Sequence, residues 1–180
     1  MGVAVGSVAV NVALSDFKQG HYVKVLIDAV RSGRIVPGDI CVEITEDLLI
    51  GQHGDRVRTA IELLHGHSFR IAFDDFGTGY ASLSHLRDLP VDMVKIDRGF
   101  IKALGSNPAD RAIVESVILL SHHLGKRVVA EGVETKVQAE ILRDLGCDYV
   151  QGFFASKPVP FAEVESAIVQ WGETGLTAWL

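Results

Sequence analysis

The chain is poor in cysteine, aromatic residues and positive charge, and it has no long apolar segment. Only two cysteines, Cys41 and Cys147, occur among its 180 residues, and they form neither a CxxC pair nor a Cys/His zinc spacing. This usage predicts a reduced, cytoplasmic protein without a disulfide framework. No apolar run approaches the ~18 residues of a membrane span. The first residues also lack a basic-then-apolar signal segment.

The shortage of positive charge limits the possible partners. Seventeen Lys and Arg residues against 23 Asp and Glu residues give a formal charge of −6. Nucleic-acid polymers bind to basic surfaces that release counterions, so this balance argues against such a partner. A small anionic ligand remains compatible if metal ions stand between it and carboxylates. With 48% hydrophobic and 22% charged residues, the composition is globular, and the length predicts one domain over residues 1–180.

Short segments rich in β-branched residues alternate with helical periodicity along the whole chain. This alternation predicts an α/β fold in which helices cross over between parallel strands. The expected strands are Val8–Asn11, Ile40–Ile44, Arg70–Asp74, Met93–Ile96, Arg127–Glu131 and Tyr149–Gly152.

Capping residues mark the expected helices between these strands. Asn107 and Pro108 predict a helix start, and Gly125 its end. Thr135 with Gln138 predicts a capping box on the next helix. The expected buried stripe of the first helix is Ile113, Val117, Leu120 and Leu124. The second helix carries the apolar residues Val137, Ile141 and Leu145 and is expected to end at Gly146.

Six polar residues lie at or near the C-terminal ends of six different expected strands. In a βα-barrel these ends converge on the face that carries the active site. Polar groups on apolar strands are costly to bury, so packing alone is a poor explanation for all six, although any one of them can be a satisfied core group. They are Asn11, Glu43, Asp74, Lys95, Glu131 and Gln151, separated by 20 to 36 residues.

The oxygen donors at these ends predict a site for hard divalent cations. Carboxylates and an amide carbonyl suit Mg²⁺ or Mn²⁺ rather than zinc. Two such metals would bridge a phosphodiester and activate a water. The donors are Asn11, Glu43, Asp74, Asp75 and Glu131.

Asp74 and Asp75 are adjacent, and adjacent residues of a regular strand face opposite sides. The segment Phe76-Gly-Thr-Gly79 that follows predicts a turn, which would let both carboxylates reach one site. Lys95 has two interpretations: an electrostatic partner of phosphate or water, or a Schiff-base nucleophile. Neighbouring carboxylates would keep its ammonium charged, so we favour the first.

Several longer motifs resemble the EAL-domain family of cyclic di-GMP phosphodiesterases. The resemblance runs from about Val8 to Pro160 in the family's order. It implies a TIM-like barrel that hydrolyses cyclic di-GMP, a bacterial second messenger in signal transduction, to linear pGpG with two Mg²⁺ or Mn²⁺ ions. The motifs are Val8-Ala-Val-Asn-Val12, Val42-Glu-Ile-Thr-Glu46, Asp74-Asp-Phe-Gly-Thr-Gly-Tyr-Ala-Ser82, Val94-Lys-Ile-Asp-Arg98, Val128-Val-Ala-Glu-Gly-Val-Glu-Thr135 and Gly146-Cys-Asp-Tyr-Val-Gln-Gly152.

The resemblance also implies a role for each matched residue. Ligands of the first metal would be Asn11, Glu43 and Asp74, and Asp74 would bridge to a second metal completed by Asp75 and Glu131. The implied catalytic residues are Lys95, which would orient the attacking water, Glu131 and Gln151, and Asp75 and Gln151 would also lie beside the substrate. Pro158 is a further candidate for substrate contact, from its position in the loop after the last motif. Glu46 would hold the loop of Phe76, Gly77, Thr78 and Gly79, which the family also uses in dimerisation.

The sequence departs from the family at one motif, because Glu-Ala-Leu, which supplies a metal ligand, occurs nowhere in it. A full TIM barrel has ~250 residues, so we expect an incomplete barrel with about six of the eight strands. Loss of one carboxylate predicts very weak or absent activity. Open barrel edges predict a homodimer or higher oligomer. The alternative is a catalytically inactive module that binds cyclic di-GMP or a protein.

Overall fold

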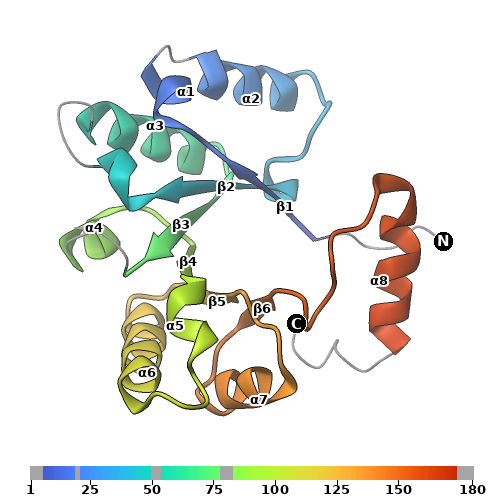
Figure 1. Cartoon of the computed structure of the whole chain (residues 1–180). Helices are drawn as coiled ribbons and strands as arrows, with labels where there is room; N and C mark the ends of the chain where they lie inside the picture. Colours follow the sequence, from blue (N-terminus) through green and yellow to red (C-terminus); the bar gives the residue numbers. More distant parts are fainter. Residues whose placement is uncertain (1–5, 19–20, 50–53, 78–82, 174–180) are drawn as a thin grey trace. The chain divides into compact units, whose positions relative to one another are not determined.

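The computed structural model describes residues 6–18, 21–49, 54–77 and 83–173, which fall into two compact units. The N-terminal unit comprises residues 6–95, and the C-terminal unit comprises the described residues from Ile96 onward. Each unit combines parallel strands with helices (Figure 1).

Among the described residues, the strands of the N-terminal unit lie in the sheet order β1-β2-β3-β4. In the parallel register, Asn11 lies opposite Glu43, and Thr45 lies opposite Asp74. The strands are β1 (Val8–Asn11), β2 (Ile40–Thr45), β3 (Arg70–Phe76) and β4 (Met93–Ile96). The helices are α1 (Leu14–Lys18), α2 (His21–Arg31), α3 (Gly54–Gly66) and α4 (Leu83–Asp88), with 3₁₀ turns η1 (Pro37–Asp39) and η2 (Glu46–Leu49).

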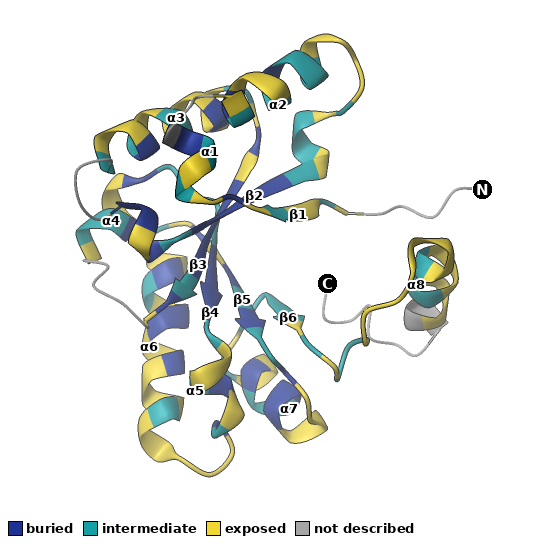
Figure 2. Ribbon diagram, turned by 45° about the horizontal axis from the view of Figure 1, so that its top comes forward, coloured by how far each residue is buried: buried dark blue, intermediate teal, exposed yellow. Residues whose placement is uncertain are grey.

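Strands β2 and β3 are buried on both faces, as is typical of a parallel sheet covered by helices. Four consecutive residues are buried in each, Cys41 to Ile44 and Ile71 to Asp74. Val57, Ile61 and Leu64 of α3 recur at helical spacing and are fully buried. In Figure 2, β2 and β3 are largely coloured as buried, whereas the helices show exposed residues on their outer faces.

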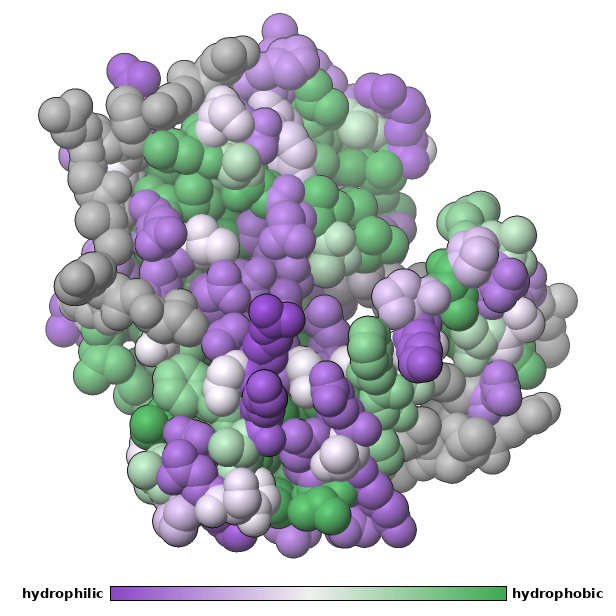
Figure 3. All heavy atoms as spheres, in the orientation of Figure 1, coloured by the Kyte–Doolittle hydropathy of each residue, from purple (hydrophilic) through white to green (hydrophobic). Residues whose placement is uncertain are grey.

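The C-terminal unit contains the parallel pair β5 (Arg127–Glu131) and β6 (Tyr149–Gln151), with Glu131 opposite Gln151. Hydrophobic and hydrophilic residues are interspersed on the face of this unit visible in Figure 3. Its helices are α5 (Arg98–Lys102), α6 (Pro108–His123), α7 (Lys136–Asp144) and α8 (Val164–Glu173), with η3 (Phe161–Glu163) before α8.

The predicted helix caps are confirmed. The Asn107 side chain accepts a hydrogen bond from the Ala109 amide (3.0 Å) at the start of α6. Thr135 and Gln138 form the expected capping box at the start of α7. The side chains that satisfy helix-end amides are local in sequence, which explains why they could be predicted.

The predicted buried stripe of α6 is partly wrong. Ile113 is 40% exposed. The buried face is rotated relative to the expectation and comprises Val114, Val117, Ile118 and Ser121. Helix α7 buries Gln138, Ala139 and Leu142, whereas its apolar residue Val137 is 58% exposed. Apolar residues of α6 lie on several sides of the helix, so hydrophobicity alone does not determine which side is buried.

Asp148 joins three segments of the C-terminal unit. Its carboxylate accepts hydrogen bonds from Arg127 Nη1 (2.6 Å), His122 Nε2 (2.7 Å) and the Val128 amide (2.8 Å). Burial acts to raise the pKa of Asp148, but the hydrogen bonds from Arg127, His122 and Val128 outweigh it and lower the pKa below its ordinary value. The folded structure therefore stabilises the charged form of the Asp148 carboxylate relative to the unfolded state.

Replacing Asp148 with asparagine is expected to lower the free energy of unfolding by about 2 kcal/mol at neutral pH. The pKa of Asp148 is lower in the folded state than in the unfolded state, where it is about 3.9. The stabilisation by the charged carboxylate is therefore fully present above about pH 3.9 and is lost as the pH falls through the folded-state pKa. The difference between the two proteins should therefore shrink in acid, measured by urea unfolding over a pH series. Asp144→Asn, at an exposed side chain, is the matched control, and an equal loss there would contradict the prediction.

Candidate metal centre

Lys95 lies between two buried carboxylates of the N-terminal unit. Its Nζ is 2.7 Å from Glu43 Oε1 and 3.1 Å from Asp74 Oδ1. The three residues come from β2, β3 and β4 and are only 4–8% exposed. Two carboxylates are costly to bury together, and the ammonium group compensates their charge. This arrangement requires a charged Lys95, whereas a Schiff-base nucleophile requires the neutral amine.

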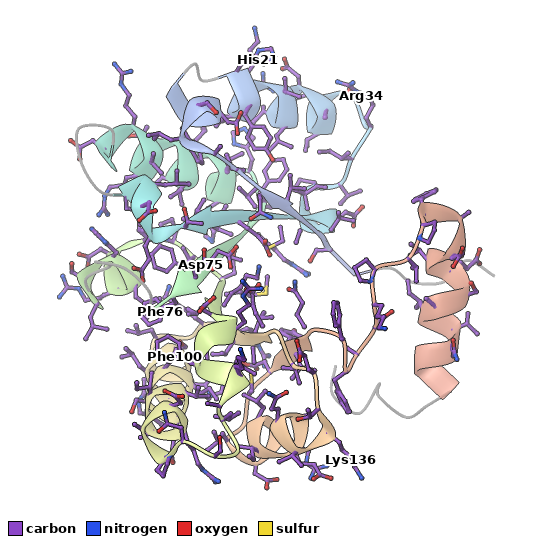
Figure 4. The ribbon with its side chains drawn as sticks, in the orientation of Figure 1. His21, Arg34, Asp75, Phe76, Phe100 and Lys136 are labelled. Atoms are coloured by element: carbon purple, nitrogen blue, oxygen red, sulfur yellow. The ribbon has the colours of Figure 1, made fainter. Side chains whose placement is uncertain are left out.

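Near its end, strand β3 departs from regular strand geometry, and this brings the carboxylates of Asp74 and Asp75 together. Their oxygen atoms lie within 4.8 Å of each other. Asp75 has a left-handed backbone (φ 54°), and its amide donates to Asp74 Oδ1 (3.0 Å). Figure 4 labels Asp75 and Phe76 at this end of β3. The left-handed residue removes the alternation that would separate the two side chains in a regular strand.

A pair of Asp75 variants separates the backbone requirement from the charge. Asparagine tolerates the left-handed region better than alanine, and both remove the carboxylate. We expect Asp75→Ala to be less stable than Asp75→Asn by about 1 kcal/mol. Thermal and urea unfolding of the two variants would measure this difference, and equal stabilities would show that the left-handed backbone imposes no cost at this position.

Glu46 contacts the loop that follows β3. Its Oε1 accepts a hydrogen bond from the Gly77 amide (3.1 Å), and its side chain is buried. The Phe76 ring is also buried and packs against Phe73, with ring centroids 6.0 Å apart. The charged hydrogen bond from Glu46 and the aromatic contact of Phe76 therefore hold the first part of this loop. The predicted loop residues Thr78 and Gly79 lie outside the described residues.

Asn11 lies at the end of β1, directly opposite Glu43 on β2. The Val12 amide donates to the Glu43 carbonyl (3.1 Å), which continues the pairing past Asn11. Neighbouring residues in register project to the same side of a sheet. Asn11 is exposed, whereas Glu43 is buried.

The C-terminal unit brings together a second pair of predicted site residues. Glu131 ends β5 and lies opposite Gln151 at the end of β6. Beyond them the Val133 amide donates to the Gln151 carbonyl (3.0 Å), and the Phe154 amide donates to the Val133 carbonyl (2.9 Å). Glu131 is half-buried and Gln151 is exposed. Pro158, after β6, is also exposed.

Cys41 is a buried neighbour of the Glu43 site rather than a reactive group. Burial, with the negative charges of Glu43 and Asp92, raises the pKa of its thiol to about 12, against weaker opposing effects of Lys95 and Arg70. The thiol is therefore protonated at neutral pH, and only its thiolate would act as a nucleophile or metal ligand.

Parallel strands, crossover helices and carboxylates near strand ends define an α/β protein with a site of metal-binding type. Residues 3–158 match the family model described as EAL domain, and the chain belongs to this family. In the part of the chain that the structure describes, no helix is both long and apolar enough to span a bilayer.

Two curated relatives illustrate the similarity. The signaling protein YkoW of Bacillus subtilis is 35% identical over 166 residues, which cover 91% of this chain and 20% of YkoW. The bifunctional diguanylate cyclase/cyclic di-GMP phosphodiesterase MucR of Pseudomonas aeruginosa is 36% identical over 167 residues, which cover 93% of this chain and 24% of MucR. The chain thus spans about a fifth to a quarter of these relatives.

Solved structures share the fold. The EAL domain of Mycobacterium smegmatis DcpA has a TM-score of 0.83 at 38% identity, covering 91% of this chain and 73% of that one. The PaMucR phosphodiesterase in complex with c-di-GMP has a TM-score of 0.81 at 37% identity, covering 88% and 64%. Klebsiella pneumoniae BlrP1 with manganese and c-di-GMP has a TM-score of 0.77 at 31% identity, covering 84% and 39%. The predicted α/β fold, an incomplete TIM-like barrel, is confirmed.

Proposed function

We propose that both units form one EAL domain that hydrolyses cyclic di-GMP to linear pGpG with two Mg²⁺ or Mn²⁺ ions. The observation that supports this most is the buried cluster of Glu43, Lys95 and Asp74, with Asp75 beside it. Relatives in the same family are named as cyclic di-GMP phosphodiesterases. We also propose a cytoplasmic location.

The donor chemistry fits divalent cations of this kind. The side chains offer carboxylate and amide oxygens, the ligands that Mg²⁺ and Mn²⁺ prefer. We assign Asn11, Glu43 and Asp74 to one metal and Asp74, Asp75 and Glu131 to the other. When bound, such metals neutralise phosphate charge and activate water.

The remaining residues act on the substrate and the attacking water. The Lys95 ammonium, which is paired with Glu43 and Asp74, orients the water. The water oxygen bonds to phosphorus and gives up a proton, the bond from phosphorus to the ribose oxygen breaks, and that ribose oxygen takes up a proton. Gln151, Asp75 and Pro158 contact the nucleotide.

Incubation with cyclic di-GMP and Mn²⁺, followed by chromatography of pGpG, tests this proposal. We expect slow turnover, because the sequence has no Glu-Ala-Leu carboxylate, and loss of product in Asp74→Asn. Product formed equally by both proteins would contradict the assignment of Asp74. Binding of the nucleotide without product would support the second candidate, a non-catalytic cyclic di-GMP-binding or protein-interaction module, which the missing motif favours.

We further propose that the chain forms a homodimer or higher oligomer. Strand β1 is at the edge of the N-terminal unit's sheet among the described residues, and its Val8 is 54% exposed. An open strand edge presents unpaired backbone groups to a second strand. Sedimentation at micromolar concentration should therefore show a dimer or larger species, and a stable monomer would rule out this proposal.

A further inference from the structure

Gln138 is a buried polar residue whose side chain makes four hydrogen bonds. Its Oε1 accepts from the amides of Glu134 and Thr135 (2.9 Å each). Its Nε2 donates to the carbonyls of Ile101 (3.1 Å) and Lys102 (3.4 Å). The residue is 8% exposed. A primary amide has two donor hydrogens and two acceptor sites on oxygen, so its hydrogen-bonding capacity is fully used.

These bonds join two helix ends that are distant in the sequence. Helix ends leave backbone groups without partners: carbonyls at the last turn and amides at the first. Ile101 and Lys102 supply carbonyls at the end of α5, where the Ile101 carbonyl also accepts from the amides of Ala103 and Leu104. Glu134 and Thr135 supply amides at the start of α7. Gln138 therefore does more than the capping box requires, because a capping box uses only its oxygen.

The segment that Gln138 holds begins immediately after Glu131. Gly132 has a left-handed backbone (φ +65°), and a Cβ there would lie 2.6 Å from Arg98 Cβ. Arg98, the first residue of α5, thus packs closely against Gly132. Gln138 links the end of α5 to the amides of Glu134 and Thr135, at the other end of the segment. Residues 132–135 are fixed against α5 at both ends.

The same segment is joined to β6 on its other side. Val133 donates to the Gln151 carbonyl and accepts from the Phe154 amide. The Glu131 backbone is therefore held between its pairing with β6 and the segment that Gln138 ties to α5. A shift of residues 132–135 would move the Glu131 carboxylate relative to Gln151.

We propose that Gln138 is a positioning residue that fixes the Glu131 carboxylate for binding a divalent cation. The proposal rests on the proposed function, which assigns Glu131 to a metal. Partners that orient metal ligands typically change metal affinity 10- to 100-fold when they are lost. In the wild-type protein, the coupling is reciprocal, so bound cation should also steady the hydrogen bonds of Gln138.

The test is a double-mutant cycle on Mn²⁺ affinity in the full chain, measured by electron paramagnetic resonance. Gln138→Glu keeps a cap acceptor but places a carboxylate against the carbonyls of Ile101 and Lys102. We expect it and Glu131→Gln each to weaken Mn²⁺ binding about 10-fold. The double variant should bind no more weakly than Glu131→Gln alone, because both changes remove the same contribution. Lys136→Ala, an exposed neighbour on α7, should leave the affinity unchanged.

Different outcomes overturn different proposals. If Glu131→Gln weakens Mn²⁺ binding but a folded Gln138→Glu does not, Gln138 is not a positioning residue and the metal assignment survives. If Glu131→Gln has no effect, both fail. If the double variant shows additive losses, Gln138 acts only on general stability. If Gln138→Glu does not fold, Gln138→Met replaces it.

Hydrogen exchange of the wild-type chain provides a readout that needs no variant. Mn²⁺ should slow exchange of the amides of Glu134 and Thr135, which bond to Gln138, measured by mass spectrometry. The Gly146 amide, at the other end of α7, should be unchanged. Unaltered exchange at Glu134 and Thr135 under saturating Mn²⁺ would also overturn the proposal.

Discussion

Replacing Lys95 with methionine is expected to lower the free energy of unfolding of the metal-free chain by about 3–5 kcal/mol. The change removes the cation that lies 2.7 Å from Glu43 and 3.1 Å from Asp74. Two carboxylates then remain buried with no compensating charge. Urea unfolding in the presence of a chelator, compared with wild type, measures the loss.

Two further proteins separate charge compensation from packing. Glu43→Gln in the Lys95→Met background removes one of the uncompensated charges and should recover much of the loss. Arg87→Met breaks the exposed pair with Asp88, and its effect should be far smaller than that of Lys95→Met, because solvent-exposed ion pairs contribute little. If Lys95→Met were as stable as wild type, the ammonium would not be compensating the carboxylates.

The metal proposal adds a second expectation for the same variant. A divalent cation bound by Glu43 and Asp74 would supply the positive charge that methionine lacks. Mn²⁺ should therefore stabilise Lys95→Met more than it stabilises wild type, since ligand that binds only the folded state adds to its stability. Equal stabilisation of the two proteins would argue against a cation beside Lys95.

The strands could be predicted because their signals are local. Strands β1, β4 and β5 have the expected bounds, since each is a short β-rich run with turn residues beside it. The expected strand ending at Asp74 continues to Phe76. The left-handed backbone of Asp75, whose amide donates to Asp74 Oδ1, lies within this extension, where a regular strand was not expected.

The buried face of α7 could not be predicted because it depends on distant groups. The apolar Val137 is 58% exposed, whereas the polar Gln138 is only 8% exposed. Burial of Gln138 is favourable only because the carbonyls of Ile101 and Lys102 and two amides satisfy its side chain. Those carbonyls are more than 30 residues away.

The candidate site was predictable as a set of residues but not as a set of contacts. Strand periodicity alone places Glu43, Asp74 and Lys95 near strand ends. In the register of β2 with β3, Asp74 lies opposite Thr45 rather than Glu43. The long side chain of Lys95 bridges this offset and pairs with both carboxylates. Sequence spacing does not show this contact.

Replacing Gly152 with alanine is expected to lower the free energy of unfolding by about 3 kcal/mol, because the new methyl group meets backbone rather than flexible side chains. Gly152 has a φ of +152°, and a Cβ there would overlap the carbonyl oxygen and amide nitrogen of Val133. The overlap can be relieved only by separating Val133 from the end of β6, which breaks its hydrogen bond with the Gln151 carbonyl.

Gly146→Ala is the matched control for this variant. Gly146 is also left-handed (φ +80°), but a Cβ there has no atom within 4 Å. Its replacement therefore carries only the backbone cost, about 1 kcal/mol. Urea unfolding should separate the two variants by about 2 kcal/mol. If they are equally stable, the close approach of Gly152 to Val133 does not constrain this end of the sheet. If only Gly152→Ala is strongly destabilised, the close approach of Gly152 to Val133 helps to hold Gln151 opposite Glu131. The geometry of that pair then depends on the absence of a side chain at residue 152.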